Sequence, residues 1–257
     1  MSHLSHLLRS RLLGVALVLG ILLVWQLSTT RGLIDSPSLP PVSTVLATWG
    51  RLLLSGELLQ HLWASLVRAF IGYGIAAVAG IALGLAMGYA RTAYNLFEPL
   101  TELLRPIPSP AYIPLAILFL GLGEQMKIFV VAFSCLFPVL LNTFGAIRAV
   151  DPILINTGRT FGTSRFQLIT KILLPSALPG ILTGLRVALG ISLILVVIAE
   201  MVASNTGIGY FILNSQRLFQ IPEMFAGIFT LAVVGYALNQ LFVLTEHFLL
   251  RWQPKRT

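Results

Sequence analysis

The stretch AFIGYGIAAVAGIALGLAMGYA, residues 69–90, determines the class of fold. Its 22 residues carry no formal charge, and Arg68 and Arg91 bound it. A helix needs about 20 consecutive, largely apolar residues to cross the hydrocarbon core of a bilayer. The stretch is therefore long and apolar enough to form a membrane-spanning helix, and it predicts an integral membrane protein.

Small residues recur at every fourth position of this stretch. They are Gly72, Ala76, Gly80, Gly84 and Gly88. Such a stripe lets a second helix approach closely, as in the GxxxG motif of membrane helices. We interpret the stripe as a packing face, and its partner helix lies either in the same chain or in a second copy.

Five further stretches have the length of a membrane span, namely residues 12–30, 106–123, 128–147, 181–203 and 224–245. We therefore predict an all-α, polytopic membrane protein with about six membrane-spanning helices. The first stretch also suits a signal peptide, because Arg9 and Arg11 precede it. Signal h-regions run only about 7–15 residues and end in small residues, so we expect this helix to be retained.

The composition of the whole chain agrees with a membrane protein. Hydrophobic residues make up 56% of the 257 residues and charged residues only 10%, whereas a soluble domain carries about 25% charged residues. This excludes a soluble monomer and a disordered chain. A single cysteine, Cys135, excludes an internal disulfide and a cysteine-rich metal site. The net charge of +8 fits basic loops on one side of a bilayer better than a nucleic-acid partner.

Basic residues also indicate the orientation of the spans. With the N-terminus inside, eleven Lys and Arg residues fall in inner segments and five in outer segments. Cytoplasmic loops carry the excess of basic residues, so we predict that both termini are cytoplasmic. The outer segment of about residues 35–68 is predicted to form two amphipathic helices, residues 42–53 and 58–66, which either pack on the bundle or bind a partner.

Three prolines interrupt the start of the predicted third span. Pro106, Pro108 and Pro110 cannot belong to a regular helix, because proline lacks the backbone donor and clashes with the preceding turn. Irregular backbone at membrane depth is tolerated where it is buried in protein or lines a watery cavity. The prolines are therefore candidates for the translocation path, and the alternative is a kinked helix start.

Glu200 lies near the outer end of the predicted fifth span, and Arg186 near its inner end. The two are about 21 Å apart along the helix axis, so they cannot pair directly. Arg186 is expected to reach the inner lipid headgroups. An acidic residue within a span is a candidate functional residue, so Glu200 is a path candidate, and the alternative is a structural hydrogen bond to a neighbouring helix.

The cytoplasmic segment of about residues 148–180 is unusually ordered for a loop. Asp151 and Pro152 predict the start of a short helix, as N-cap and first-turn proline. The helix should run to about Phe161, because Gly162 suits the left-handed residue that ends a helix.

A second short helix is expected after Gly162. Ser164 and Gln167 have the spacing of a capping box, and the helix should stop before Pro175. A pair of short helices joined at a glycine is typical of a segment that docks onto a cytoplasmic partner. The alternative is an ordinary surface loop.

No motif in the sequence points to catalysis or to a metal. The chain has no G-x-x-x-x-G-K-[ST] phosphate loop, no H-E-x-x-H motif and no Ser/His/Asp grouping. We therefore expect neither an enzyme nor a cofactor-binding chain. Uphill transport would then draw its energy from another subunit or from an ion gradient.

The cytoplasmic segment resembles that of the membrane permease subunits of binding-protein-dependent ABC importers. Their signature is E-A-A, three residues, glycine, nine residues and I-x-L-P. Here Gly162 is followed nine residues later by Ile172-Leu173-Leu174-Pro175, whereas Asn156-Thr157-Gly158 replaces E-A-A. By this resemblance the residues that couple to the ATPase subunit are Asn156, Thr157, Gly158, Arg159, Thr160, Phe161, Gly162, Thr163 and Ser164.

The resemblance extends over roughly residues 40–253. Arg105-Pro106-Ile107-Pro108 and Gly207-Ile208-Gly209-Tyr210 look like the nitrate/taurine/aliphatic sulfonate branch of the family. The ending Leu250-Arg251-Trp252-Gln253-Pro254 looks most like the aliphatic sulfonate permeases. The resemblance thus implies an importer of an aliphatic sulfonate, with nitrate, bicarbonate or taurine as alternatives.

Family membership implies the remaining organisation. It implies one permease domain over residues 1–257 with the type I ABC importer permease fold, in the bacterial inner membrane. The partners would be a second copy of the chain, two ATP-binding cassette subunits that hold ATP and Mg²⁺, membrane lipid, and a periplasmic or extracytoplasmic substrate-binding protein.

Two other classes of protein fit less well. A secondary transporter would need several intramembrane carboxylates and an inverted repeat, but the spans hold one deep acid and no obvious repeat. A membrane-embedded enzyme would need a cluster of nucleophile, base or metal ligands.

Overall fold

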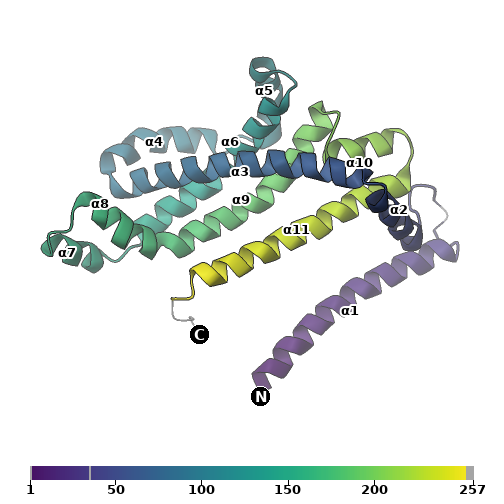
Figure 1. The fold of residues 1–257 in the computed structure, drawn as a ribbon, viewed down its shortest axis with the longest axis horizontal. Coiled ribbons are helices and arrows are strands. Elements are labelled where there is room, and N and C mark those ends of the chain that lie inside the picture. The colour runs from purple at the N-terminus through teal and green to yellow at the C-terminus, as the bar shows by residue number, and fades with distance from the viewer. Residues whose placement is uncertain (1, 35, 253–257) are drawn as a thin grey trace. The chain divides into compact units, whose positions relative to one another are not determined.

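The computed structural model describes residues 2–34 and 36–252, so Gln253 and Pro254 of the family-like ending lie outside the described residues. The described residues form helices and no strand (Figure 1). The helices are α1 (Ser2–Thr30), α2 (Val42–Leu54), α3 (Glu57–Tyr89), α4 (Arg91–Leu104), η1 (Ser109–Tyr112), α5 (Ile113–Leu120), α6 (Glu124–Arg148), α7 (Pro152–Thr160), α8 (Arg165–Leu168), η2 (Ile169–Leu173), α9 (Leu174–Ala203), α10 (Ile208–Arg217) and α11 (Ile221–Leu249).

The chain divides into two compact units. The first comprises residues 1–60 and 211–230, and the second comprises residues 61–210 and 231–257. In the first unit, α2 packs on the start of α11 through Trp49, whose indole nitrogen donates to Thr230 Oγ1 at 2.9 Å. An ion pair of 2.8 Å between Arg51 and Glu223 joins the same two helices.

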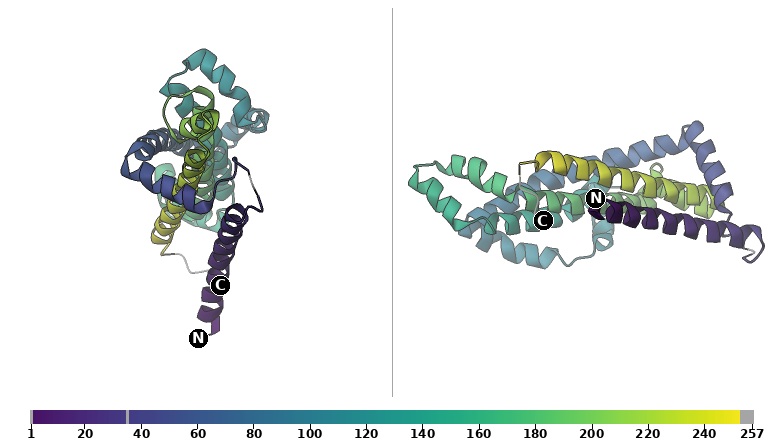
Figure 2. Two further views of the ribbon diagram at one scale, coloured as in Figure 1. Left: turned by 90° about the vertical axis from the view of Figure 1, so that its right-hand side faces the viewer. Right: turned by 90° about the horizontal axis from the view of Figure 1, so that it is seen from below.

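In the second unit, α3, α6 and α9 lie side by side (Figures 1 and 2), and α6 packs against both of the other helices. A Cβ atom on Gly72 would lie 2.7 Å from Val131 Cβ, and one on Gly84 would lie 2.6 Å from the Leu140 carbonyl oxygen. On the other side of α6, a Cβ on Gly184 would lie 2.7 Å from Asn142 Cβ. The glycine stripe of α3 therefore packs on a helix of the same chain.

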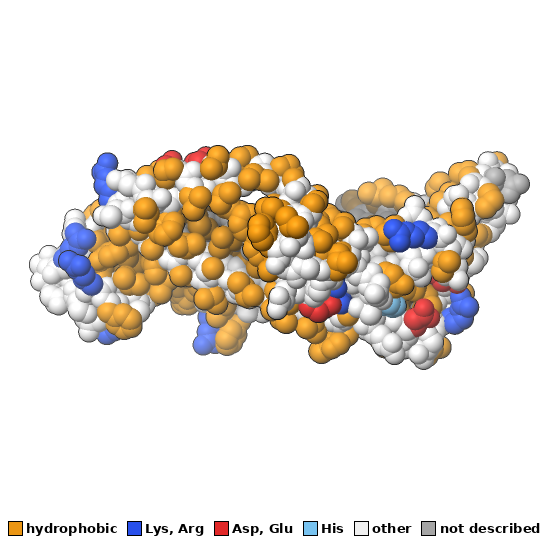
Figure 3. Space-filling view, turned by 90° about the horizontal axis from the view of Figure 1, so that it is seen from above, with side chains coloured by type: hydrophobic (Ala, Val, Ile, Leu, Met, Phe, Trp, Pro, Cys, Tyr) orange, Lys and Arg blue, Asp and Glu red, His pale blue; other side chains and the backbone are white. Residues whose placement is uncertain are grey.

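Four helices in the described part of the chain are long and apolar enough to cross a membrane, and a bent pair brings the number to five. The four are Glu57–Tyr89, Glu124–Arg148, Arg165–Ala203 and Ile221–Leu249. The polytopic all-α membrane fold is confirmed, whereas the number of about six spans stays a prediction, because the count covers only part of α1 (Ser2–Thr30). Hydrophobic side chains dominate the face shown in Figure 3, as expected of a protein that meets lipid.

The predicted third span, residues 106–123, is not one helix. Its prolines leave residues 105–108 outside any helix, and α5 ends after 8 residues at Gly121, whose φ is 72°. Eight residues rise only about 12 Å, too little to cross a bilayer alone. The segment Ser109–Leu120 instead forms the bent pair with Arg91–Leu104, at an angle of 93°.

Two predicted helix boundaries were wrong. The expected separate helix at residues 58–66 is the beginning of α3, which continues past Arg68. The expected stop before Pro175 is absent, because the π-helical η2 leads directly into α9 and places Pro175 in the first turn of α9. A π-helical turn shifts the hydrogen-bond register, which accommodates the missing donor of proline without ending the helix.

Candidate functional site

The short helices α7 and α8 form a capped pair between α6 and α9, here called the coupling segment (residues 152–168). Asp151 caps α7, because its Oδ1 accepts from the Ile153 amide at 2.8 Å. Gly162 follows α7 with φ +71°, and its amide donates to the Arg159 carbonyl at 3.0 Å. The predicted end of this helix at a left-handed glycine is confirmed.

The predicted capping box of α8 is also present. The Ser164 amide donates to Gln167 Oε1 at 3.2 Å, and the Gln167 amide donates to Ser164 Oγ at 3.3 Å. Gly158 is buried, and a Cβ atom there would lie 2.6 Å from Ile172 Cδ1. A glycine at position 158 therefore lets α7 pack against the start of the long helix that follows.

Most of the nine predicted coupling residues are exposed. Gly158 is buried and Thr163 is half-buried, whereas the other seven are exposed. Phe161 is 83% exposed and Phe166 is 75% exposed, and Ile153 and Leu154 are exposed as well. Large hydrophobic side chains on a segment that is predicted to lie in water indicate a surface that another protein covers.

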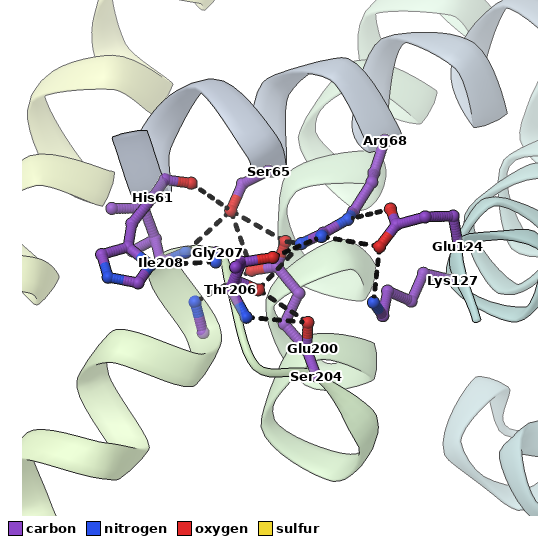
Figure 4. A network of polar contacts seen from close by, with 11 residues as sticks. His61, Ser65, Arg68, Glu124, Lys127, Glu200, Ser204, Thr206, Gly207 and Ile208 are labelled. Atoms are coloured by element: carbon purple, nitrogen blue, oxygen red, sulfur yellow. Dashed lines mark hydrogen bonds and ion pairs between the residues drawn. The ribbon is translucent and has the colours of Figure 1, made fainter. Parts of the chain in front are cut away.

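A network of charged and polar groups lies at the opposite end of α6 and α9 (Figure 4). We call it the polar network, and it joins α3, α6, α9 and the turn after α9. Its charged members are Arg68, Glu124, Lys127 and Glu200. Arg68 Nη1 lies 2.6 Å from Glu200 Oε1, and Arg68 Nη2 lies 2.8 Å from Glu124 Oε1. Lys127 Nζ lies 2.9 Å from the same Glu124 oxygen.

Glu200 is the most enclosed member of the polar network, with 0% of its side chain exposed. Besides Arg68, it contacts the Ser65 hydroxyl at 2.8 Å and accepts from the Gly209 amide at 3.0 Å. These contacts support the structural alternative, in which Glu200 bonds to a neighbouring helix. Arg186 is not its partner and instead donates to Asn239 Oδ1 at 3.2 Å.

The chain closes over the Glu200 carboxylate because glycines lie in the turn after α9, at Gly207, and in the first turn of α10, at Gly209. A Cβ atom on Gly207 would lie 2.2 Å from Glu200 Cδ, and φ at this residue is +110°. A Cβ on Gly209 would lie 2.3 Å from the Val197 carbonyl oxygen. The Gly207 amide also donates to His61 Nδ1 at 3.1 Å. Residues with side chains at these positions would displace the turn.

Sequence reasoning missed Ser65, Arg68, Glu124 and Lys127 as members of a site. Arg68 was used only to mark the end of a span. Its partner Glu200 lies far away in the sequence, 132 positions after Arg68. The signal that was available is the glycine pair Gly207 and Gly209, which lies seven and nine positions after the acidic residue Glu200 in a span.

Two of the path-candidate prolines, Pro106 and Pro108, lie in the turn before η1, and Pro110 lies in η1; a pocket of about 270 Å³ lies beside them. We call it the proline-turn pocket. The prolines themselves shape the turn, whereas their neighbours Arg105, Ile107 and Ser109 line the pocket together with Tyr112, Ser134 and Phe137. Glu200 does not line this pocket, so the structure separates the four predicted path candidates into two places.

Comparisons with known proteins agree with this architecture. The family described as binding-protein-dependent transport system inner membrane component matches residues 76–251. A Bacillus subtilis (strain 168) protein, SsuC, named for aliphatic sulfonates transport, is 37% identical over 240 residues, covering 93% of this chain and 87% of that protein. Its Escherichia coli (strain K12) namesake is 38% identical over 238 residues, covering 93% and 90%.

A taurine transport system permease protein, TauC of Escherichia coli (strain K12), is 32% identical over 232 residues, covering 88% of this chain and 84% of that protein. A chain of the methionine ABC transporter MetNI, solved in inward-facing conformations, has a TM-score of 0.67 and 18% sequence identity, covering 75% of this chain and 95% of that chain. The structural likeness confirms the type I ABC importer permease fold. The chain therefore belongs to the family of binding-protein-dependent transport system inner membrane components, the permease subunits of ABC importers.

Proposed function

We propose that this permease imports an aliphatic sulfonate across the bacterial inner membrane, driven by ATP hydrolysis in a separate subunit. The relatives that are 37% and 38% identical over 93% of the chain, both named for aliphatic sulfonates, carry this proposal. Taurine is itself a sulfonate, so the taurine permease among the relatives supports the same class of substrate. Nitrate and bicarbonate are the alternative substrates.

Type I ABC importer permeases work with ATPase subunits and substrate-binding proteins. We infer that this chain forms one permease domain and assembles as a homodimer, with two ATP-binding cassettes below it and a binding protein outside. Both termini lie in the cytoplasm in this arrangement. The cassettes bind ATP and Mg²⁺, and the permease itself needs no cofactor.

We infer that Asn156 to Ser164 couple the permease to the cassette, because the exposed Phe161 lies among them and Phe166 follows them in the same segment. The helix that begins at Arg165 continues without a break to Ala203, a length of 39 residues. A displacement of α8 by the cassette would therefore pass directly into α9. Glu200 lies near the far end of this 39-residue helix, where the polar network joins it to α3 and α6.

Growth experiments test the substrate. Deletion of the gene is expected to abolish growth on an alkanesulfonate as sole sulfur source and to leave growth on sulfate unchanged. A deletion strain that still grows on the sulfonate, in a background with no second importer, would contradict the proposal and favour nitrate or bicarbonate.

A further inference from the structure

The proline-turn pocket is lined by hydrophobic and polar side chains and by one cation, Arg105. It lies between the turn before η1 and the face of α6 that carries Ser134, Phe137 and Leu141. These three residues follow one another at spacings of three and four along α6, so they share one face of that helix. The volume of about 270 Å³ is at the small end of ligand pockets.

We propose that this pocket is the substrate-contact site of the permease, which takes an alkanesulfonate with its sulfonate group beside Arg105 and Tyr112 and its alkyl chain along Phe137 and Leu141. The assignment of the ligand rests on the proposed function. Its geometry rests on the four features that follow.

The first feature is the depth of the pocket in the membrane. Ser134 lies ten residues after the start of α6 at Glu124 and fourteen before its end at Arg148, so by helix rise it is about 15 Å and 21 Å from the two ends. The pocket is therefore near the middle of a membrane-spanning helix. Transporters commonly bind substrate at this depth, where a helix is broken, and here the break is the 93° bend between α4 and the segment Ser109–Leu120.

The second feature is the irregular backbone of residues 105–108. These residues belong to no helix, and Pro106 and Pro108 lack amide donors. Non-helical backbone at membrane depth is tolerated where it lines a cavity or is buried in protein. A pocket that admits water or a polar ligand beside residues 105–108 explains why this non-helical backbone is tolerated within the membrane.

The third feature is a pair of hydroxyl groups on the pocket wall. Ser134 is 8% exposed, and its hydroxyl donates to the Val130 carbonyl at 2.8 Å. The Tyr112 hydroxyl bonds to Ser134 Oγ, and since the Ser134 proton points at Val130, tyrosine is the donor in this pair. Rotation of the Tyr112 hydroxyl would exchange this neutral hydrogen bond for one to an anionic oxygen, which is the stronger type.

The fourth feature is the Arg105 guanidinium, whose ion pair with Glu102 is weak. Arg105 Nη2 lies 3.2 Å from Glu102 Oε2, and the two side chains are 49% and 50% exposed. Exposed pairs of this kind contribute about 0–1 kcal/mol. Arginine presents a planar fork of donors that suits an oxyanion with several oxygens. Arg105 can therefore exchange Glu102 for a sulfonate with little loss of free energy.

The experiment uses the whole complex, with cassettes and binding protein, in proteoliposomes. It measures ATP-driven uptake of radiolabelled methanesulfonate and hexanesulfonate, ATP hydrolysis and the amount of assembled complex. Arg105→Gln is expected to lower uptake of both sulfonates at least tenfold, with the amount of assembled complex at the wild-type level. Arg105→Lys, which keeps the charge, should recover part of the uptake. Arg91→Gln, at the opposite end of α4, is the matched control and should import like the wild type.

Two further variants separate ligand contact from a structural role. Tyr112→Phe removes only the hydroxyl group and should lower uptake of both sulfonates about equally, while the amount of assembled complex stays at the wild-type level. Phe137→Ala should lower uptake of hexanesulfonate several-fold more than uptake of methanesulfonate, because only the longer chain reaches Phe137. General damage to the fold would lower uptake of both sulfonates to the same extent and would also lower the amount of assembled complex.

The outcomes distinguish this inference from the proposed function. A wild-type complex that imports sulfonates, with Arg105→Gln and Tyr112→Phe variants that import equally well, would overturn the pocket and leave the proposed function standing. A wild-type complex that imports no alkanesulfonate would overturn both the function and this assignment of the ligand.

Discussion

The two ends of α6 and α9 are built in opposite ways. At one end, the polar network buries Glu200 and Arg68 and provides each with partners from α3, α9 and the turn after α9. At the other end, the coupling segment is held by local caps and exposes Phe161 and Phe166. At the first end, the buried charges find their partners within the same chain. At the second end, exposed hydrophobic side chains indicate a surface that another protein covers.

This difference assigns different roles to the two ends. A buried ion pair such as Arg68–Glu200 is fixed in geometry, because each charge is costly to bury without its partner. A capped helix pair with exposed hydrophobic side chains can instead be moved by whatever covers it. We therefore expect changes in the polar network to reduce stability, and changes in the coupling segment to reduce transport while leaving the fold intact.

Arg68→Gln should have the largest effect on stability, because it leaves the Glu200 carboxylate buried without its cation. Removing one partner of a buried ion pair costs about 3–5 kcal/mol. We expect a large fall in the apparent Tm of the purified permease and in its level in the membrane. The measurement is thermal unfolding in detergent together with immunoblotting of membranes.

The control for this variant is Arg51→Gln. Arg51 also forms an ion pair, with Glu223, but its side chain is 67% exposed. Exposed pairs contribute about 0–1 kcal/mol, so this variant should behave like the wild type. Equal stability of the Arg68 and Arg51 variants would contradict the structural role of the polar network.

Gly207→Ala should have the next largest effect. The new Cβ would overlap the Glu200 carboxyl group, at 2.2 Å from Cδ, and alanine would adopt a φ of +110°. Backbone strain alone costs about 1–3 kcal/mol, so the apparent Tm should fall. Gly190→Ala is the matched control, because a Cβ there has no heavy atom within 4 Å. If both variants unfold at the same temperature, the turn does not close over the carboxylate as described.

Gly162→Val tests the other end. The φ of +71° disfavours a β-branched residue, and strain of about 1–3 kcal/mol should tilt α8 away from its partner. We expect normal membrane levels, about tenfold or greater loss of cassette retention on purification, since about 1.4 kcal/mol is a factor of ten, and little transport. Wild-type transport with full cassette retention would show that this segment does not couple the subunits.

Phe166→Ser should have the smallest effect on the fold. The side chain is 75% exposed, so its loss should leave the apparent Tm of the isolated permease unchanged. Truncation of an aromatic residue at the centre of an interface typically costs more than 1 kcal/mol of binding. Cassette retention should therefore fall several-fold, measured by co-purification at increasing salt. A lower Tm without loss of the cassette would place Phe166 in the fold instead of the interface.

Local features of this chain could be predicted from the sequence. The Asp151 cap, the left-handed Gly162 and the Ser164–Gln167 capping box depend on residues within a few positions of one another, and all three are present. The glycine stripe of α3 was also correctly interpreted as a packing face, although its partner helix could not be chosen without the structure.

Features that depend on distant residues could not be predicted. Arg68 was assumed to end a span because a count of charges cannot detect Glu124 and Glu200, which neutralise it inside the protein. Pro175 was assumed to end a helix because the sequence gives no sign of the π-helical turn before it. In both cases a residue that is unfavourable by itself, a charge within a span or a proline within a helix, is accommodated by the surrounding structure.

The most direct test of the account is a cross-link from the coupling segment. The chain contains one cysteine, Cys135, which is buried, so Phe161→Cys introduces an exposed thiol at a chosen place. A bifunctional reagent applied to native membranes, followed by mass spectrometry, should join residue 161 to an ATP-binding cassette subunit, and ATP should change the yield. A cross-link to the extracytoplasmic binding protein, or no cross-link to a cassette that co-purifies with the permease, would contradict the account.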